Sequence, residues 1–246
     1  MHNKLNLRDC GEYLTAAGKK LKHGMLYRSG SLDHLHGKYF RVVASLKLKT
    51  IIDLRPSKER HGKITFLPGC NRVTIPYDIE SITRKRIIPF FNKRHGTPGL
   101  IQAVESVYYD AVTPQSNPIR MIFEYLIVER NYPLCINCLA GKDRTGLTIA
   151  LLLRLLDVPF ETVMKDYLST NSNLLPRVRR VTTPLKLLSF GLLPTRTWEA
   201  ALTAYDSYLA TAFNRIENVY DGVTYYLSLC CVSNAKQQQF AAIILD

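Results

Sequence analysis

The stretch NCLAGKDRTG, residues 137–146, places a cysteine, Cys138, and an arginine, Arg144, on either side of five residues. A cysteine thiolate is a nucleophile and a metal ligand. An arginine guanidinium pairs with two oxygens of a phosphate or carboxylate at once. The stretch is therefore a candidate for a turn, a metal site, a redox site or an anion site. The elements on either side of it must distinguish these.

Two apolar runs flank the stretch. YPLCIN, 132–137, predicts a short buried strand, and residues 145–156 predict a helix that is apolar nearly all round. The first N–H groups of such a helix have no intrahelical partner and carry the positive end of its dipole, so they bind an anion readily. Gly141 lets the backbone approach that anion, and Arg144 can pair with two of its oxygens. The same amides favour a thiolate at Cys138, which suits phosphoryl transfer to sulfur followed by hydrolysis.

Rival interpretations of the stretch fit less well. An ATP-binding loop needs a glycine where Ile136 stands and a serine or threonine where Asp143 stands. A zinc site needs further ligands, and no histidine follows His95. A redox pair of Cys135 and Cys138 would have its intervening residues in the predicted strand, whereas such enzymes place the pair at a helix start. An ordinary turn with a buried cysteine is the plain alternative.

The composition of the chain narrows the classes of partner and the cellular compartment that we expect. The 246 residues carry 33 Lys and Arg against 20 Asp and Glu, a net charge of +13, which favours phosphorylated molecules, an anionic membrane contacted peripherally, or nucleic acid. Nucleic acid is the least expected of these. The N-terminus has no apolar signal core, and the most apolar run, LTIALLLRLL, is short and interrupted by Arg154. We expect a soluble protein with reduced thiols, cytoplasmic or secreted without a cleaved signal peptide.

Strand-like and helical runs alternate along the chain. Besides the runs around the loop, strands are predicted at 50–54 and 71–77, helices at 100–112 and 118–129, and a turn followed by another helix at 157–171. The alternation predicts an α/β fold with a largely parallel central sheet flanked by helices, in one domain spanning 1–246. The basic, aromatic segment 80–100 is expected to be a loop or lid, or a long surface insertion. A helical C-terminal part is expected over about 198–246, with breaks at 221–222 and 233–234.

At these residues a family resemblance is evident. The loop NCLAGKDRTG resembles the signature loop of bacterial cysteine-dependent tyrosine and lipid phosphatases of the protein tyrosine phosphatase B type. The resemblance covers most of the chain and is least clear over 78–100 and 176–196. Further segments that carry it are 6–35, 50–60 (TIIDLRPSKER), 166–171 (DYLSTN) and 219–227 (VYDGVTYYL).

The resemblance implies a phosphatase fold and a role for each loop residue. Cys138 is implied as the nucleophile, and Asp143 holds the position proposed as general acid in relatives that lack an acid on a separate loop. Lys142 would add positive charge toward acidic substrates such as phosphoinositides. The implied phosphate-binding residues are Leu139, Ala140, Gly141, Lys142 and Arg144. The implied substrates are phosphotyrosine and, in several members, phosphoserine, phosphothreonine and phosphoinositides. No metal or cofactor is implied, because the cation role falls to Arg144 and the amides.

One residue departs from the family pattern. Asn137 stands where the family has a histidine that orients the loop and favours the thiolate. Asparagine can donate hydrogen bonds but carries no charge, so the rate is affected more than the reaction type. The departure supports an alternative function, a catalytically slow module that captures phosphorylated partners. Thr145 is expected to support the loop by bonding the sulfur or by capping the helix.

The identity of the general acid is left open by the residues. Asp143 could be the acid, or it could be held in an ion pair with Lys142 or Arg144. Asp78, after a predicted strand, is the second candidate. Three more charged residues, Asp53, Arg55 and Arg28, could approach the site, and a structural role that supports the loop is expected for each.

Overall fold

The computed structural model describes residues 5–60, 65–78, 96–114, 118–189 and 195–246. Most of the basic segment 80–100 lies outside these ranges, so the expected loop or lid is not among the described residues. Its last residues, from Gly96 on, already belong to a helix.

The centre of the molecule is a five-stranded sheet with the strand order β1-β2-β5-β3-β4. The four strands β2, β5, β3 and β4 are parallel, and β1 joins the edge antiparallel, as the sequence predicts for a largely parallel sheet. The bounds of the strands are β1 (Arg8–Asp9), β2 (Leu26–Ser29), β3 (Thr50–Asp53), β4 (Asn71–Thr74) and β5 (Leu134–Asn137).

The register of the sheet decides what surrounds the loop after β5. Asn137, the last residue of β5, is aligned with Ser29 of β2 and with Asp53 of β3. The carboxyl ends of these parallel strands meet at one edge of the sheet, which is where α/β folds bind their ligands. The segments that follow β2 and β3 therefore border the candidate loop.

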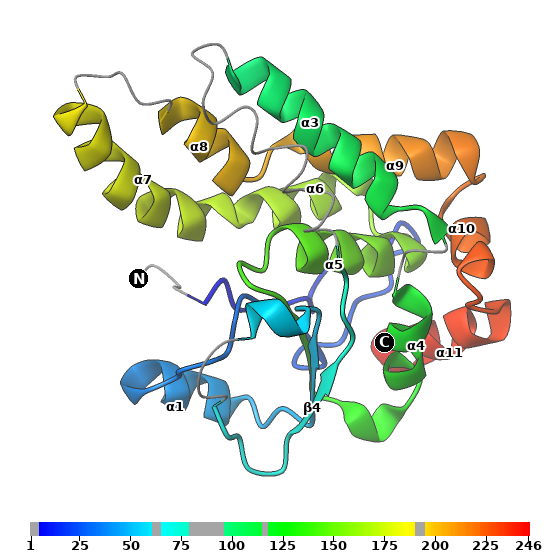
Figure 1. Cartoon of the computed structure of the whole chain (residues 1–246). Helices are drawn as coiled ribbons and strands as arrows, with labels where there is room; N and C mark the ends of the chain where they lie inside the picture. The colour runs from blue at the N-terminus through cyan, green and yellow to red at the C-terminus, as the bar shows by residue number, and fades with distance from the viewer. Residues whose placement is uncertain (1–4, 61–64, 79–95, 115–117, 190–194) are drawn as a thin grey trace.

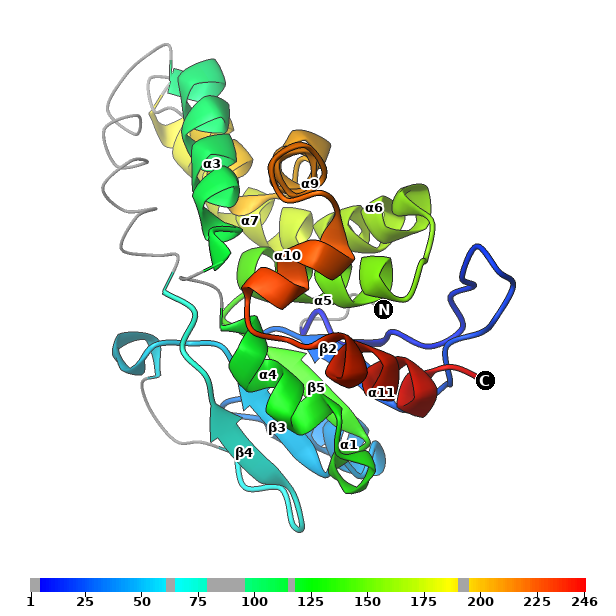
Figure 2. The same cartoon turned by 90° about the vertical axis from the view of Figure 1, so that its right-hand side faces the viewer.

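Helices cover both faces of the sheet. Figure 1 shows α1 on one side and most of the other helices on the opposite side, and Figure 2 shows α5 lying directly over the strands. Within the described ranges, no helix is long and apolar enough to cross a membrane. The helix bounds are α1 (Gly37–Ser45), α3 (Gly96–Ala111), α4 (Ile119–Leu126), α5 (Asp143–Leu155), α6 (Phe160–Ser169), α7 (Asn171–Leu188), α8 (Thr195–Leu202), α9 (Asp206–Val219), α10 (Val223–Leu229) and α11 (Asn234–Ile244), with 3₁₀ turns η1 (Ser57–Glu59) and η3 (Glu129–Asn131).

The alternation of side chains along β5 divides the hydrophobic core. Leu134 and Ile136 pack in the larger cluster, with α5, and Cys135 packs in the smaller one, with Val43 of α1. Residues 144–153 of α5 are all buried, as expected for a helix that is apolar nearly all round. A buried leucine stabilises the fold by about 1.5–3 kcal/mol, so this helix anchors the loop that precedes it.

Candidate active site

The loop between β5 and α5 bends back on its own cysteine. The backbone N–H of Gly141 donates to the Sγ of Cys138 over 3.3 Å, and Cys138 is buried. A donor directed at the sulfur stabilises the thiolate relative to the thiol. The residue that the sequence identifies as the nucleophile therefore has a backbone donor directed at its sulfur.

Gly141 is required at its position for two reasons. Its φ of +69° lies in the left-handed region, which residues with a side chain rarely adopt. A Cβ there would also lie 2.7 Å from the carbonyl carbon and oxygen of Ser29 and from the backbone nitrogen of Gly30. The loop thus packs backbone against backbone on the segment after β2, and Ser31 strengthens this contact by donating its N–H to the carbonyl of Leu139 over 2.9 Å.

Arg144, in the first turn of α5, is held by a carboxylate that sequence reasoning missed. Its Nη1 and Nη2 donate to Oε1 and Oε2 of Glu59, at 2.7 and 2.5 Å. Burial alone would lower the pKa of Arg144, but the Glu59 bonds and the nearby Cys138 outweigh it, so the pKa lies above its ordinary value. Glu59 lies in η1, within the segment 50–60 that carries the family resemblance, and no role was assigned to it from the residues.

The carbonyl groups of the loop are fixed from behind. Asn6 donates its Nδ2 to the carbonyls of Ala140 and Gly141, each at 3.1 Å. The Nη2 of Arg28, a fully buried side chain, donates to the same Gly141 carbonyl over 2.8 Å. These bonds hold two loop carbonyls, which would repel an anion, against the N-terminal segment. Arg28 was expected to support the loop, and the group that it binds there is the Gly141 carbonyl.

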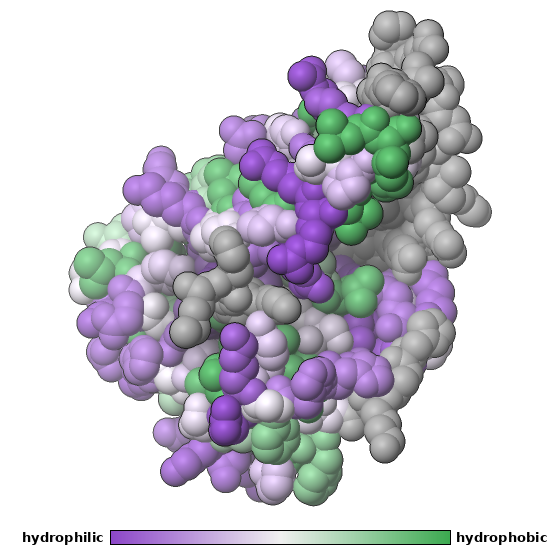
Figure 3. Space-filling model, turned by 90° about the vertical axis from the view of Figure 1, so that its left-hand side faces the viewer, coloured by the Kyte–Doolittle hydropathy of each residue, from purple (hydrophilic) through white to green (hydrophobic). Residues whose placement is uncertain are grey.

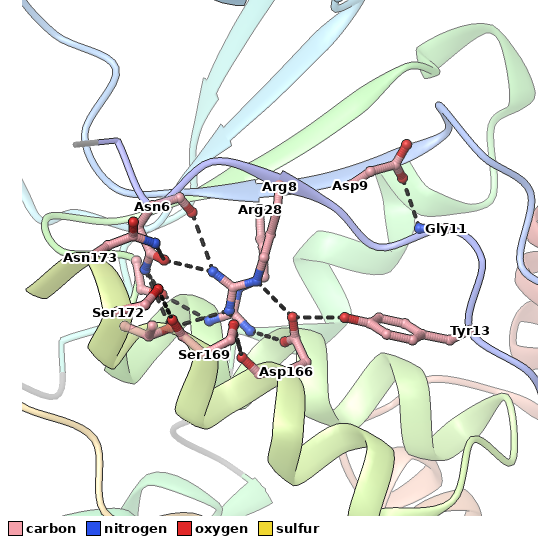
Figure 4. Close-up of polar contacts among 12 residues, drawn as sticks. Asn6, Arg8, Asp9, Gly11, Tyr13, Arg28, Asp166, Ser169, Ser172 and Asn173 are labelled. Atoms are coloured by element: carbon pink, nitrogen blue, oxygen red, sulfur yellow. Dashed lines mark hydrogen bonds and ion pairs between the residues drawn. The ribbon is translucent and has the colours of Figure 1, made fainter. Parts of the chain in front are cut away.

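A buried carboxylate organises these supports (Figure 4). Asp166 of α6 accepts from the Nε of Arg8 at 2.7 Å, from Tyr13 at 3.1 Å and from Arg28. Burial raises the pKa of Asp166, but the charges of Arg28 and Arg8 more than offset this and the pKa lies below its ordinary value. Helix α6 is thus connected through Asp166 and Arg28 to the carbonyl of Gly141.

The candidate general acid, Asp143, is the first residue of α5 and is 40% exposed. Its Oδ1 accepts a hydrogen bond of 2.7 Å from the hydroxyl of Tyr108, which lies 2.8 Å from the hydroxyl of Tyr167. Burial, followed by the charge of Asp143, raises the pKa of Tyr108 well above its usual value, so Tyr108 stays a donor. The Nζ of Lys142 lies 3.2 Å from the same oxygen. Tyr108 and Lys142 thus hold the Asp143 carboxyl at the loop. The contact with Lys142 is the ion pair that the sequence left open as an alternative to the acid role.

The side chain of Lys142 is not placed as the resemblance implied. Its side chain is 4% exposed, and its Nζ donates to the carbonyls of Ala201 and Thr203 at 2.9 and 3.1 Å. The ammonium therefore connects the loop to the end of α8, whereas the resemblance implied a charge facing acidic substrates.

The two supporting residues predicted from the sequence are buried. By strand alternation Asn137 shares the face of Cys135, away from the cluster that holds Cys138. The side-chain oxygen and nitrogen of Asn137 have no hydrogen-bond partner among the described residues. The hydroxyl of Thr145 has none there either. Lys142 occupies the N-cap position of α5, so Thr145 is not its cap.

The remaining charged candidates form ion pairs with other side chains. Arg55 pairs with Asp53 at 2.6 Å and with Asp33 at 2.7 Å, a buried arrangement of the structural kind expected for Asp53 and Arg55. Asp78 is half exposed and lies 3.6 Å from the Nζ of Lys58.

A pocket of about 1130 Å³ opens beside the loop. Leu139 and Ala140 of the loop form part of its wall, together with Arg55 and Glu59 from the segment after β3. The opposite wall is mostly apolar and comes from α7 and α8, with Leu174, Val178, Val181, Trp198 and Leu202.

The geometry around Cys135 and Cys138 bears on the two alternatives of a metal site and a redox pair. Among the residues that the structure describes, no group of three His, Cys, Asp or Glu could hold a metal ion. Cys135 and Cys138 pack in separate clusters, and both are free thiols. Burial raises the pKa of Cys135 to about 12, which keeps it protonated and unreactive at neutral pH.

Comparisons with known proteins agree with the site. The model of a family described as the tyrosine phosphatase family matches residues 1–246. The triple specificity protein phosphatase PtpB of Mycobacterium tuberculosis is 24% identical over 270 residues, which cover 98% of this chain and 96% of that protein. A protein of Cupriavidus necator, provisionally named a tyrosine-protein phosphatase, is 28% identical over 172 residues, covering 68% of this chain and 60% of its own length.

Proposed function

Because the chain belongs to the tyrosine phosphatase family and is a phosphoric monoester hydrolase, we propose that it works through a phosphocysteine intermediate on Cys138. One observation carries the proposal. The Gly141 N–H is directed at the Cys138 sulfur in a loop whose Arg144 is fixed by Glu59. A nucleophile and a cation are thereby held at the two ends of one anion-binding loop.

In the first step the Cys138 thiolate attacks phosphorus, the S–P bond forms, and the P–O bond to the leaving group breaks. Asp143 donates its proton to the departing oxygen. Arg144 and the loop amides hold the non-bridging oxygens and stabilise their charge in the transition state. In the second step a water gives a proton to the Asp143 carboxylate and attacks phosphorus, which releases phosphate and restores the thiolate.

The pocket supports phosphate esters of large leaving groups as substrates. Its apolar wall from α7 and α8 faces the loop residues Leu139 and Ala140, and its volume exceeds that of a single aromatic ring. We propose phosphotyrosine as the substrate class, with phosphoserine, phosphothreonine and phosphoinositides as further substrates. The name of the mycobacterial relative, a triple specificity phosphatase, is consistent with this range.

The test is turnover of p-nitrophenyl phosphate, followed by a panel of phosphopeptides and phosphoinositides, with wild type and Cys138→Ser. The variant is expected to lose turnover and to retain binding of phosphate analogues, because sulfur attacks whereas Arg144 and the amides bind. Vanadate should inhibit, and a chelator should not. Activity of Cys138→Ser within about tenfold of wild type would reject the proposal, since a missing nucleophile costs far more than that.

The same assay separates the alternative of a slow phosphate-binding module. That alternative depended on Asn137, whose side-chain oxygen and nitrogen have no hydrogen-bond partner among the described residues. A wild-type enzyme that binds vanadate but turns over no member of the panel would support the module.

A further inference from the structure

Helix α7 carries an unusual combination of charge and exposed apolar surface. Its sequence, NSNLLPRVRRVTTPLKLL, contains four cationic residues and no acidic one. Three of its large apolar side chains are mostly exposed, Val181 at 61%, Leu187 at 73% and Leu188 at 78%. Large exposed apolar side chains gathered on one element mark an interaction surface.

The apolar residues form a stripe that runs from the pocket to the end of the helix. Leu174, Val178, Val181, Leu185 and Leu188 follow each other at intervals of three or four residues, so they share one face of α7. Leu174 and Val178, at the start of the stripe, are buried in the wall of the pocket. Val181 and Leu188, further along, are exposed, so the second half of the stripe faces solvent.

The exposed half of α7 also carries cations. Arg179, Arg180 and Lys186 are exposed, and the helical spacing places them on the side of the helix away from the stripe, with Leu187 next to Arg180. Figure 3 shows hydrophobic and strongly hydrophilic side chains next to each other over the upper part of this side of the molecule. A helix with an apolar face and with Lys and Arg on its polar face is the pattern of a helix that lies in the interface of a membrane with anionic lipids.

We propose that the C-terminal half of α7, with Val181, Leu187 and Leu188 and the cations Arg179, Arg180 and Lys186, docks on an anionic membrane surface. The leucines enter the boundary between headgroups and acyl chains, and the cations pair with lipid phosphates and carboxylates. The net charge of +13 adds long-range attraction to the same partner. Because the stripe continues into the pocket wall, docking brings the pocket close to the lipid surface. This inference goes beyond the proposed hydrolysis and does not depend on it.

The test is sedimentation of the full chain with two kinds of vesicle, phosphatidylcholine alone and phosphatidylcholine with phosphatidylserine. Neither lipid is a phosphate monoester, so binding does not report the active site. We expect binding to the anionic vesicles only, equal for wild type and Cys138→Ser, and weakened by salt. Leu187→Ser/Leu188→Ser and Arg179→Glu/Arg180→Glu should each lower the affinity by about tenfold or more.

Matched controls come from the far side of the molecule, around α4 and α10 (Figure 1). Met121→Ser/Leu229→Ser removes two exposed apolar side chains there, and Arg120→Glu/Arg130→Glu makes an equal change of charge at exposed positions. Both controls should bind vesicles nearly as wild type does. The four double variants of the test and the control should keep wild-type turnover of p-nitrophenyl phosphate, which shows that they fold. Equal losses in test and control variants, or no binding of wild type to anionic vesicles, would overturn the proposal. So would equally tight binding of single-stranded RNA that is insensitive to the leucine substitutions.

Discussion

Glu59 and Arg144 meet as two parallel hydrogen bonds of 2.7 and 2.5 Å, so the carboxylate fixes the plane of the guanidinium at the start of α5. Glu59→Gln keeps the shape but removes the charge and one acceptor. We expect kcat/KM for p-nitrophenyl phosphate to fall by about tenfold to a hundredfold, because misplacing a binding group by a fraction of an ångström has effects of that order. Steady-state kinetics of Glu59→Gln beside Glu129→Gln, an exposed residue of η3, provide the measurement. An unchanged kcat/KM for Glu59→Gln would show that Arg144 needs no such support.

Gly141→Ala should distort the loop. The new Cβ would lie 2.7 Å from the backbone of Ser29, and the φ of +69° would be strained in addition. We expect activity to fall by at least about a hundredfold, because the N–H directed at Cys138 is displaced. Gly18→Ala is the matched control, since Gly18 has a φ of +78° and no atom within 4 Å of its added Cβ. Equal activity of the two variants would contradict the close contact described for the loop.

Asp143→Asn should impair esters with poor leaving groups far more than activated aryl phosphates, because a phenolate of low pKa leaves without a proton. Tyr108→Phe removes the donor that orients the Asp143 carboxyl. It should also impair esters with poor leaving groups more than activated aryl phosphates, to a smaller extent than Asp143→Asn does. The measurement is kcat/KM against the leaving-group pKa for each variant. If Asp143 is only a structural partner of Lys142, both substrate classes will fall together. A steeper dependence for Asp78→Asn would assign the acid role to Asp78.

Asp166→Asn should destabilise the fold in a pH-dependent way. Its loss leaves Arg28 buried without its counter-charge, which costs about 3 kcal/mol of unfolding free energy at pH 7. Because the pKa of Asp166 is lowered in the folded state, its stabilisation is complete above about pH 5. It begins to fall below about pH 4, the ordinary pKa of an aspartate, and is lost as the pH falls through the lowered value, so the wild type and the variant should converge only in stronger acid.

Urea unfolding at several pH values measures this difference. The control, Glu12→Gln, removes an exposed ion pair with Lys20 and should lose far less stability. A wild-type advantage that persists unchanged into strong acid would show that the Asp166 charge is not its source.

The parts of the site that lie on one continuous stretch could be predicted from the sequence. The apolar run before Asn137, the loop glycine Gly141 and the apolar helix behind Arg144 specify a strand, a tight turn and a helix N-terminus by local rules alone. Strands β3, β4 and β5 and helices α3 to α6 follow the predicted order. Their ends differ by a few residues, as at α4, which ends at Leu126, before the expected residue 129.

The parts that depend on distant partners could not be predicted in this way. Strand β2 contains Arg28, whose burial is stable only because Asp166 lies 138 residues further along the chain. Glu59 gains its role from Arg144, 85 residues away. Helix α7 contains Pro176 and Pro184, which local rules treat as helix breakers, yet it continues through both and packs against α8.

The proposed phosphocysteine is tested most directly by acid quench during turnover of an activated aryl phosphate, followed by peptide mass spectrometry. The peptide that contains Cys138 should gain the mass of one phosphoryl group. This species should appear within the first turnover, together with a burst of released phenol, and should be absent from Cys138→Ser. Asp143→Asn should accumulate more of it if Asp143 also activates the water. A phosphoryl group on another residue, or none at any time while the wild-type enzyme turns over, would contradict Cys138 as the nucleophile.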